Sequence, residues 1–211
     1  MLQELVSRCG GIPKVIVELA GSMAKRRVGW IDRAGSINDK FLRELETNRE
    51  FASLSGLFDW MQSYFRNCSD SLKPCVFYLS IFSPKQLIRR RRLVRRWIAE
   101  GYSRDSHDKT AEENGEEQFS SLLNLSIIQQ PSSVGLGGTR MVSCGVNGFF
   151  REYIVSRRME ENLVFELDGS CAPTSQRTGR HLVISESWVR DQIVYMSIDF
   201  SKLCSLTVSG E

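Results

Sequence analysis

The spacing of apolar residues predicts helices over most of the first hundred positions. Apolar side chains recur three and four residues apart, which is typical of amphipathic helices. Because proline lacks an N–H that would be unpaired in the first turn, Pro13 favours the start of a helix. The stretch RRVGWIDRAGS lacks this spacing and predicts a loop. The predicted helices are Gln3–Arg8, Pro13 to about Lys25, Ile37–Glu46, Ser53–Arg66 and Leu72–Ile81.

The next stretch, KQLIRRRRLVRRWIAEGY, predicts another helix that ends at Gly101. Its apolar stripe is Leu87, Ile88, Leu93, Val94, Trp97 and Ile98. A polar connection then leads into an acidic helix, and two short strands follow, joined by the loop PSSVGLGG. Three helices followed by two strands with a Gly-rich loop are typical of a winged helix.

The segment SCGVNGFFREYI contains an Asn-Gly pair between apolar residues, which is the usual signal of a tight hairpin. The residues after Gly148 do not alternate as a returning strand would. Phe149, Phe150, Tyr153 and Ile154 instead lie on one face of a helix. We therefore predict a helix from Phe149 to Ser156, with Asn147 as its N-cap.

From Asn162 onward the pattern changes to short strands separated by polar turns. The strands are LVFEL, RHLVIS, IVYMSI and LCSLTVSG. The last contains Leu203-x-x-Leu206-x-Val208, which matches the core of a leucine-rich repeat. Because the pattern occurs once, it is compatible both with a leucine-rich repeat and with an unrelated strand.

Composition places the chain among ordinary globular proteins. It has 211 residues, of which 41% are hydrophobic and 25% charged, and a net charge of +3 that does not by itself require nucleic acid. The six cysteines form no C-x-x-C unit, so they argue against a zinc site and for a reducing compartment. Charged residues interrupt the apolar N-terminal stretch, and we predict neither a membrane span nor a secretory signal.

A basic run between Lys85 and Arg96 holds seven cations and no acid. On a winged helix this run suggests DNA binding. Consecutive arginines, however, spread around a helix, and nearby glutamates could pair with them. We therefore favour a solvated or internally paired helix face, and we expect Trp97 to be core and not a stacking platform.

Catalytic motifs are absent from the sequence. There is no G-x-x-x-x-G-K-[ST] phosphate cradle, and no Ser-His-Asp, Cys-His or H-E-x-x-H arrangement. The sequence therefore predicts a protein that is not an enzyme.

Four segments, in order, resemble the nucleotide-binding region of plant NB-ARC leucine-rich-repeat disease-resistance proteins. The segment CGGIPKVIVELAGSMA is similar to the family's Gly-Leu-Pro-Leu helix, at residues 11–14, with Lys14 in place of the last leucine. LKPCVFYLSIFSP resembles the motif that opens the winged helix, and RRRRLVRRWIAEGY the stretch after it. SCGVNGFFREYIVSRRMEENLVF lies where the family has its Met-His-Asp or Val-His-Asp motif.

The resemblance implies a mainly α fold with three parts. These are a helical ARC subdomain over residues 1–66, a winged-helix subdomain over 67–160, and the first short strands of a leucine-rich-repeat domain over 161–211. It also implies two cofactor-binding residues. Pro13 matches the family proline near adenine, and Asn147 matches the histidine that reaches the phosphates of ADP.

The match at Asn147 is degenerate, because Val146-Asn147-Gly148 stands where the family has Val-His-Asp. An asparagine amide can donate a hydrogen bond but cannot become positively charged. We therefore expect Asn147 and Gly148 to hold ADP more weakly than the His-Asp pair would.

The resemblance implies a cytoplasmic, regulatory and nonenzymatic role in plant defence. The family binds ADP or ATP, but the half that carries the Walker A lysine does not occur in this sequence, so we expect a fragment, a truncated gene or a truncated gene model without nucleotide or ATPase activity. Expected partners are other receptor domains or chains, and a pathogen effector that binds the repeats. We expect no membrane span and no binding of nucleic acid. The alternatives are a DNA-binding winged helix that uses residues 85–96 and a non-functional receptor remnant.

Overall fold

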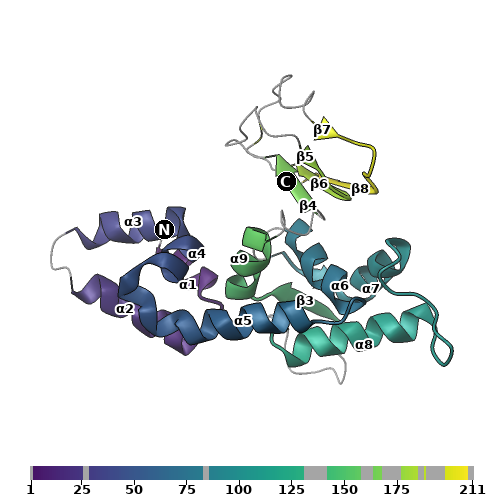
Figure 1. The fold of residues 1–211 in the computed structure, drawn as a ribbon, viewed down its shortest axis with the longest axis horizontal. Coiled ribbons are helices and arrows are strands. Elements are labelled where there is room, and N and C mark those ends of the chain that lie inside the picture. Colours follow the sequence, from purple (N-terminus) through teal and green to yellow (C-terminus); the bar gives the residue numbers. More distant parts are fainter. Residues whose placement is uncertain are drawn as a thin grey trace.

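The structure, a computed structural model, describes residues 2–25, 29–82, 86–130, 142–157, 164–167, 177–184, 188 and 198–208. Helices make up two adjoining groups, and short strands form a separate unit beside the second group (Figure 1). The prediction of a mainly helical fold with a winged helix and a few short strands is confirmed.

The first group of helices contains two elements, one α-helix and one 3-10 helix, that the sequence did not predict. Its elements are α1 (Leu2–Arg8), α2 (Pro13–Ala24), α3 (Trp30–Asp39), α4 (Phe41–Thr47), the 3-10 helix η1 (Arg49–Leu54) and α5 (Ser55–Asn67). The loop predicted for residues 26–36 is wrong from Trp30 onward, where α3 begins after Gly29 in the left-handed conformation. This helix buries only Ala34 and Ile37, a contact face too narrow to stand out among its polar residues.

The second group has the element order of a winged helix. Its elements are α6 (Leu72–Tyr78), the 3-10 helix η2 (Leu79–Ile81), β1 (Ile88–Arg89), α7 (Arg90–Ala99), α8 (Ala111–Asn124), β2 (Ile128–Gln129), β3 (Ser143–Val146) and α9 (Gly148–Arg157). The strands pair antiparallel in the order β1-β3-β2. The predicted Gly-rich loop, residues 131–138, lies outside the described residues.

The helix predicted to follow Lys85 begins later than its apolar stripe suggests. Ile88 lies in β1 opposite Cys144, and the Leu87 side chain is 56% exposed. The backbone N–H of Arg90 donates to the Val142 carbonyl at 2.9 Å, so pairing with the segment before β3 ends where the helix starts. Further along α7, Trp97 is fully buried, which confirms the prediction that it belongs to the core.

The C-terminal strands form two parallel ladders. They are β4 (Val164–Leu167), β5 (Arg177–Thr178), β6 (His181–Ile184), β7 (Ile198–Asp199) and β8 (Ser205–Val208). The ladders have the orders β4-β6-β8 and β5-β7, and all pairs are parallel. A short strand thus precedes each of β6 and β8, the arrangement of stacked repeat units. The predicted strand IVYMSI lies mostly outside the described residues.

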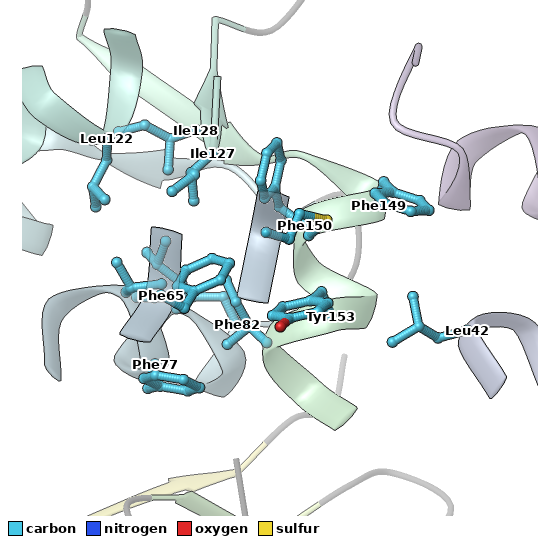
Figure 2. Close-up of a cluster of buried hydrophobic side chains, with 14 of the residues drawn as sticks. Leu42, Phe65, Phe77, Phe82, Leu122, Ile127, Ile128, Phe149, Phe150 and Tyr153 are labelled. Carbon is cyan, nitrogen blue, oxygen red and sulfur yellow. The ribbon is translucent and has the colours of Figure 1, made fainter. Parts of the chain in front are cut away.

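Helix α9 lies between the two helical groups. Figure 2 shows Phe149 on the side of α9 toward Leu42, with Tyr153 near Phe65 on the other side. The Phe149 ring contacts Phe41 at 6.4 Å between centroids, and Tyr153 stacks on Phe65 at 5.1 Å. One continuous hydrophobic core therefore runs through both groups, and the predicted boundary at residues 66 and 67 stays a prediction.

Candidate functional site

Two of the motifs singled out in the sequence meet where α1 ends and α9 begins. Asn147 precedes α9, and its side chain is only 3% exposed. Its Oδ1 accepts hydrogen bonds from the backbone N–H groups of Phe149 at 3.0 Å and Phe150 at 3.4 Å. The prediction that Asn147 is the N-cap of this helix is confirmed.

The other end of the Asn147 amide reaches the turn after α1. Its Nδ2 donates to the Gly10 carbonyl at 2.8 Å. Gly10 has a φ of +60°, and a Cβ at this position would lie 2.0 Å from Oδ1 of Asn147. Only glycine therefore fits at position 10, because both the backbone conformation and the asparagine exclude a side chain.

Gly148 is required for a different reason. A Cβ at this position would lie 2.0 Å from the Ser7 carbonyl oxygen and 3.2 Å from the Arg8 Cα. The backbone of α1 thus occupies the space that a side chain at position 148 would need. We call the contact made by Gly10, Asn147, Gly148 and Phe149 the α1–α9 joint.

A cavity of about 560 Å³ lies beside the α1–α9 joint. Its lining residues are Glu4, Val6, Ser7, Arg8, Gly10, Gly11, Gln129, Val146, Gly148, Arg151 and Glu152. The two sequence motifs therefore contribute glycines to one cavity. Pro13 begins α2 with an exposed side chain, and neither Pro13 nor Asn147 lines the cavity. Their contact with a nucleotide stays a prediction.

The cations in this cavity are engaged within the chain. Arg8 donates to the Asn38 carbonyl at 2.5 Å and forms ion pairs with Glu4 at 3.3 Å and Glu152 at 3.6 Å. Arg151 donates to the Phe82 carbonyl at 3.1 Å. Because the first N–H groups of α9 are also capped, these residues alone do not fit a diphosphate.

A second contact joins the winged helix to the strands. His181 of β6 is 1% exposed, and its Nε2 lies 2.5 Å from the Tyr102 hydroxyl and its Nδ1 2.6 Å from the Ser205 hydroxyl. The Tyr78 ring meets the imidazole edge to face at 4.8 Å. Burial, with a smaller contribution from Arg180, lowers the pKa of His181 to about 4. We call this contact, made by His181, Tyr78, Tyr102 and Ser205, the histidine joint.

The winged helix of this chain has known relatives. Residues 81–152 match the family described as "Disease resistance protein Winged helix domain". The chain belongs to the disease resistance proteins, since a protein of that family from Oryza sativa subsp. japonica is 30% identical over 99% of it.

The similarity to disease resistance proteins extends beyond the winged helix. The protein PIK6-NP of Oryza sativa subsp. japonica is 30% identical over 213 residues, which are 99% of this chain and 20% of that protein. Pik-2 of the same organism is 29% identical over 214 residues, again 99% of this chain and 20% of that protein. The putative RPP13-like protein 2 of Arabidopsis thaliana is 26% identical over 194 residues, 91% of this chain and 21% of that protein. The chain thus spans about a fifth of the length of these relatives.

The basic run of this disease-resistance winged helix is only partly paired. Arg90 forms an ion pair with Glu116 of α8, and its guanidinium lies 4.6 Å from the Phe119 ring centroid. Arg91, Arg92 and Arg95 are exposed. In a helix-turn-helix the second helix enters the major groove. Here that helix is α8, whose first turn carries Glu112 and Glu113, so its charge opposes contact with phosphates.

The described residues include neither a cluster of metal ligands nor a helix that could cross a membrane. Among these residues no three His, Cys, Asp or Glu side chains come together as metal ligands would. No helix in the described ranges has the length and apolarity needed to cross a membrane.

Proposed function

We propose that this chain is the regulatory switch portion of a plant disease-resistance receptor. The observation that supports this role is that a buried polar side chain lies at each contact between the winged helix and its two neighbours. Asn147 of the winged helix binds Gly10 of the first helical group, and Tyr102 of the winged helix binds His181 of the strand unit. Because both joints involve buried polar groups, a shift of the winged helix relative to either neighbour must break or re-form the hydrogen bonds of that joint.

In the complete receptor, the switch responds to ADP and ATP and passes the response to leucine-rich repeats that begin with β4, β6 and β8. The protein is cytoplasmic, has no enzymatic activity and acts in defence with other domains or chains of receptors, and an effector can engage the repeats. The chain on its own binds no nucleotide. This last point is supported by the engaged cations of the cavity and by the lack of a G-x-x-x-x-G-K-[ST] motif among residues 1–211.

The proposal can be tested in a full-length relative such as Pik-2, with its matching segment replaced by residues 1–211 of this chain. We expect purified protein to carry ADP, and Asn147→Ala and His181→Ala to accelerate ADP release several-fold because each breaks one joint. His107→Ala is the matched control, since His107 is exposed and its Nδ1 lies 3.0 Å from the Asp108 carboxylate. Protein without nucleotide, or release rates equal in all variants, would contradict the proposal.

The same receptor tests whether position 147 senses phosphate. We expect Asn147→His to slow ADP release, because a histidine near a diphosphate can become cationic. Gly148→Asp is unsuitable for this experiment, since its Cβ would collide with the Ser7 carbonyl. Unchanged release in Asn147→His would mean that residue 147 acts only as a helix cap and as a bridge to Gly10.

A further inference from the structure

A second large cavity lies between α7 and the edge strand β8, away from the candidate site. It has a volume of about 880 Å³. Its lining residues are Phe82, Gln86, Leu87, Ile88, Arg89, Arg91, Arg92, Arg95, Arg96, Ala99, Thr207 and Val208. Five arginines and no carboxylate line this cavity, which we call the arginine groove.

The sequence suggested that the arginines spread around the helix, and this is wrong for most of them. Arg91 and Arg95 are one turn apart, as are Arg92 and Arg96, so four guanidiniums share one side of α7. Arg90 alone lies on the α8 side, where it pairs with Glu116. The groove thus collects most of the cations of the basic run, of which Arg96 also packs on the Phe82 ring.

These guanidiniums have few partners inside the molecule. Arg96 lies 5.6 Å from the Phe82 ring centroid. Within the described ranges, Arg89, Arg91, Arg92 and Arg95 form no ion pair. Like charges gathered on one concave surface repel one another, and a bound anion relieves this repulsion.

The groove is also apolar along part of its length. Leu87 at the start of the groove is 56% exposed, and Val208 on the facing strand is 66% exposed. A ligand that fits both features must carry negative charges and aliphatic side chains. Double-stranded DNA offers phosphates but no aliphatic side chain, and the acidic first turn of α8 opposes it further.

We propose that the arginine groove binds an acidic segment of a partner protein, in which carboxylates are interspersed with aliphatic residues. The arginines bind the carboxylates, since the guanidinium fork matches carboxylate geometry and can bind it bidentately. Leu87 and Val208 cover the aliphatic side chains. Because the groove is formed by α7 and β8 together, an occupied groove also holds the strand unit against the winged helix.

The test uses the purified full chain and two fluorescein-labelled peptides. One peptide contains six glutamates and three leucines, and the other contains six glutamates and three serines. We expect the leucine peptide to bind in the micromolar range at physiological salt and about tenfold more tightly than the serine peptide, a difference of about 1.4 kcal/mol. Fluorescence anisotropy measures both affinities, and a labelled DNA duplex serves as the competing ligand class.

Variants connect this binding to the groove. Arg91→Glu combined with Arg95→Glu should weaken the leucine peptide at least about tenfold. The matched control is Arg43→Glu with Arg49→Glu, which changes net charge equally at exposed arginines of the first helical group. Leu87→Ser should remove most of the preference for leucine, whereas Val17→Ser, also at an exposed aliphatic residue, should not.

Several results would overturn the proposal. One is an equal loss of affinity for the leucine peptide in the Arg43→Glu, Arg49→Glu control. The others are no binding of the leucine peptide, and DNA binding as tight as that of the leucine peptide. Sedimentation without peptide gives a further criterion. Self-association that disappears in the Arg91→Glu, Arg95→Glu variant would make a second copy of this chain the occupant, and would likewise overturn it.

Discussion

The α1–α9 joint buries aromatic rings against a shared core, whereas the histidine joint depends on polar contacts around one imidazole. Phe149 meets Phe41 and Phe58 at 6.4 Å and 6.0 Å, inside the cluster that spans both helical groups. The strands contribute Val164 and Val183 to that cluster. Their remaining core is a small separate cluster, made of Phe165, Leu167, Leu182 and Ile198.

This difference indicates which joint can open. Separating α1 from α9 would expose large apolar surface, at a cost of several kcal/mol. Opening the histidine joint exposes less apolar surface and lets Tyr102, His181 and Ser205 exchange their hydrogen bonds for bonds to water. We therefore expect the first two groups to move as one body and the strand unit to separate from them more readily.

The largest effect should come from removing the aromatic anchor of the α1–α9 joint. Phe149→Ala is expected to destabilise the chain by about 3–5 kcal/mol, because it deletes a fully buried ring. Urea denaturation monitored by circular dichroism measures the change. Trp60→Ala is the control, since Trp60 contacts the same helix through Phe150 but is half exposed.

A smaller cost for Phe149→Ala than for Trp60→Ala would contradict the comparison between the joints. It would mean that the two helical groups do not depend on the core they share. In that case α9 would not be a rigid link, and the prediction that they move together would be wrong.

The second prediction concerns the close approach of the backbones. Gly148→Ala should cost about 2–3 kcal/mol, because its Cβ meets the Ser7 carbonyl oxygen at 2.0 Å and α1 must shift. Gly145→Ala is the matched control on the preceding strand, where a Cβ would meet nothing within 4 Å. Urea denaturation measures both variants. Equal denaturation midpoints would show that α1 does not pack on Gly148 in solution.

Local sequence signals predicted much of this fold but not its joints. The spacing of apolar residues located α2, α5 and α6, and the cap at Asn147 followed from residue type alone. The requirement for glycine at position 148 could not be predicted, because the clashing atom belongs to Ser7, far away in the chain. The same holds for His181, whose partner Tyr102 lies 79 positions earlier.

The arginine groove shows a further limit of sequence patterns. Helical periodicity alone places Arg91, Arg92, Arg95 and Arg96 on one side of α7. The run of consecutive arginines nevertheless suggested that their side chains spread around the helix. The facing wall comes from β8, which no local pattern connects to α7. The tertiary contacts are therefore needed to tell which way the charged side chains of such a run face.

The third prediction uses pH to open the histidine joint. The ordinary pKa of histidine is 6.5, and burial lowers that of His181 to about 4, with Tyr78, Tyr102, Glu100 and Arg180 around it. Above about pH 6.5 the neutral ring contributes its full stability, and this is lost as the pH falls toward 4. At pH 5 the docked strands should be about 2 kcal/mol less stable than at pH 8.

Amide hydrogen exchange of β6, corrected for the intrinsic rate at each pH, measures the free energy of opening. The matched variants are His181→Gln, which does not titrate, and His107→Gln, which removes an exposed histidine. The pH effect should disappear in the first and persist in the second. A pH effect that survives His181→Gln would assign the acid sensitivity to another group.

The smallest expected effect separates the two hydrogen-bonding roles of Asn147. Asn147→Asp keeps an oxygen for the N–H groups of Phe149 and Phe150, and a carboxylate is favourable at a helix N-terminus. It replaces the N–H donated to Gly10 with an oxygen that faces the Gly10 carbonyl, and the favourable cap offsets part of this loss, so we expect a cost of about 1 kcal/mol. Asn147→Ala loses both roles and should cost about 2 kcal/mol. Urea denaturation at pH 8, where the aspartate is ionised, compares the variants. If Asn147→Asp is as stable as the wild type, the bond to Gly10 does not hold the joint together, and the apolar core of Phe149 alone accounts for the rigidity of this side of the winged helix.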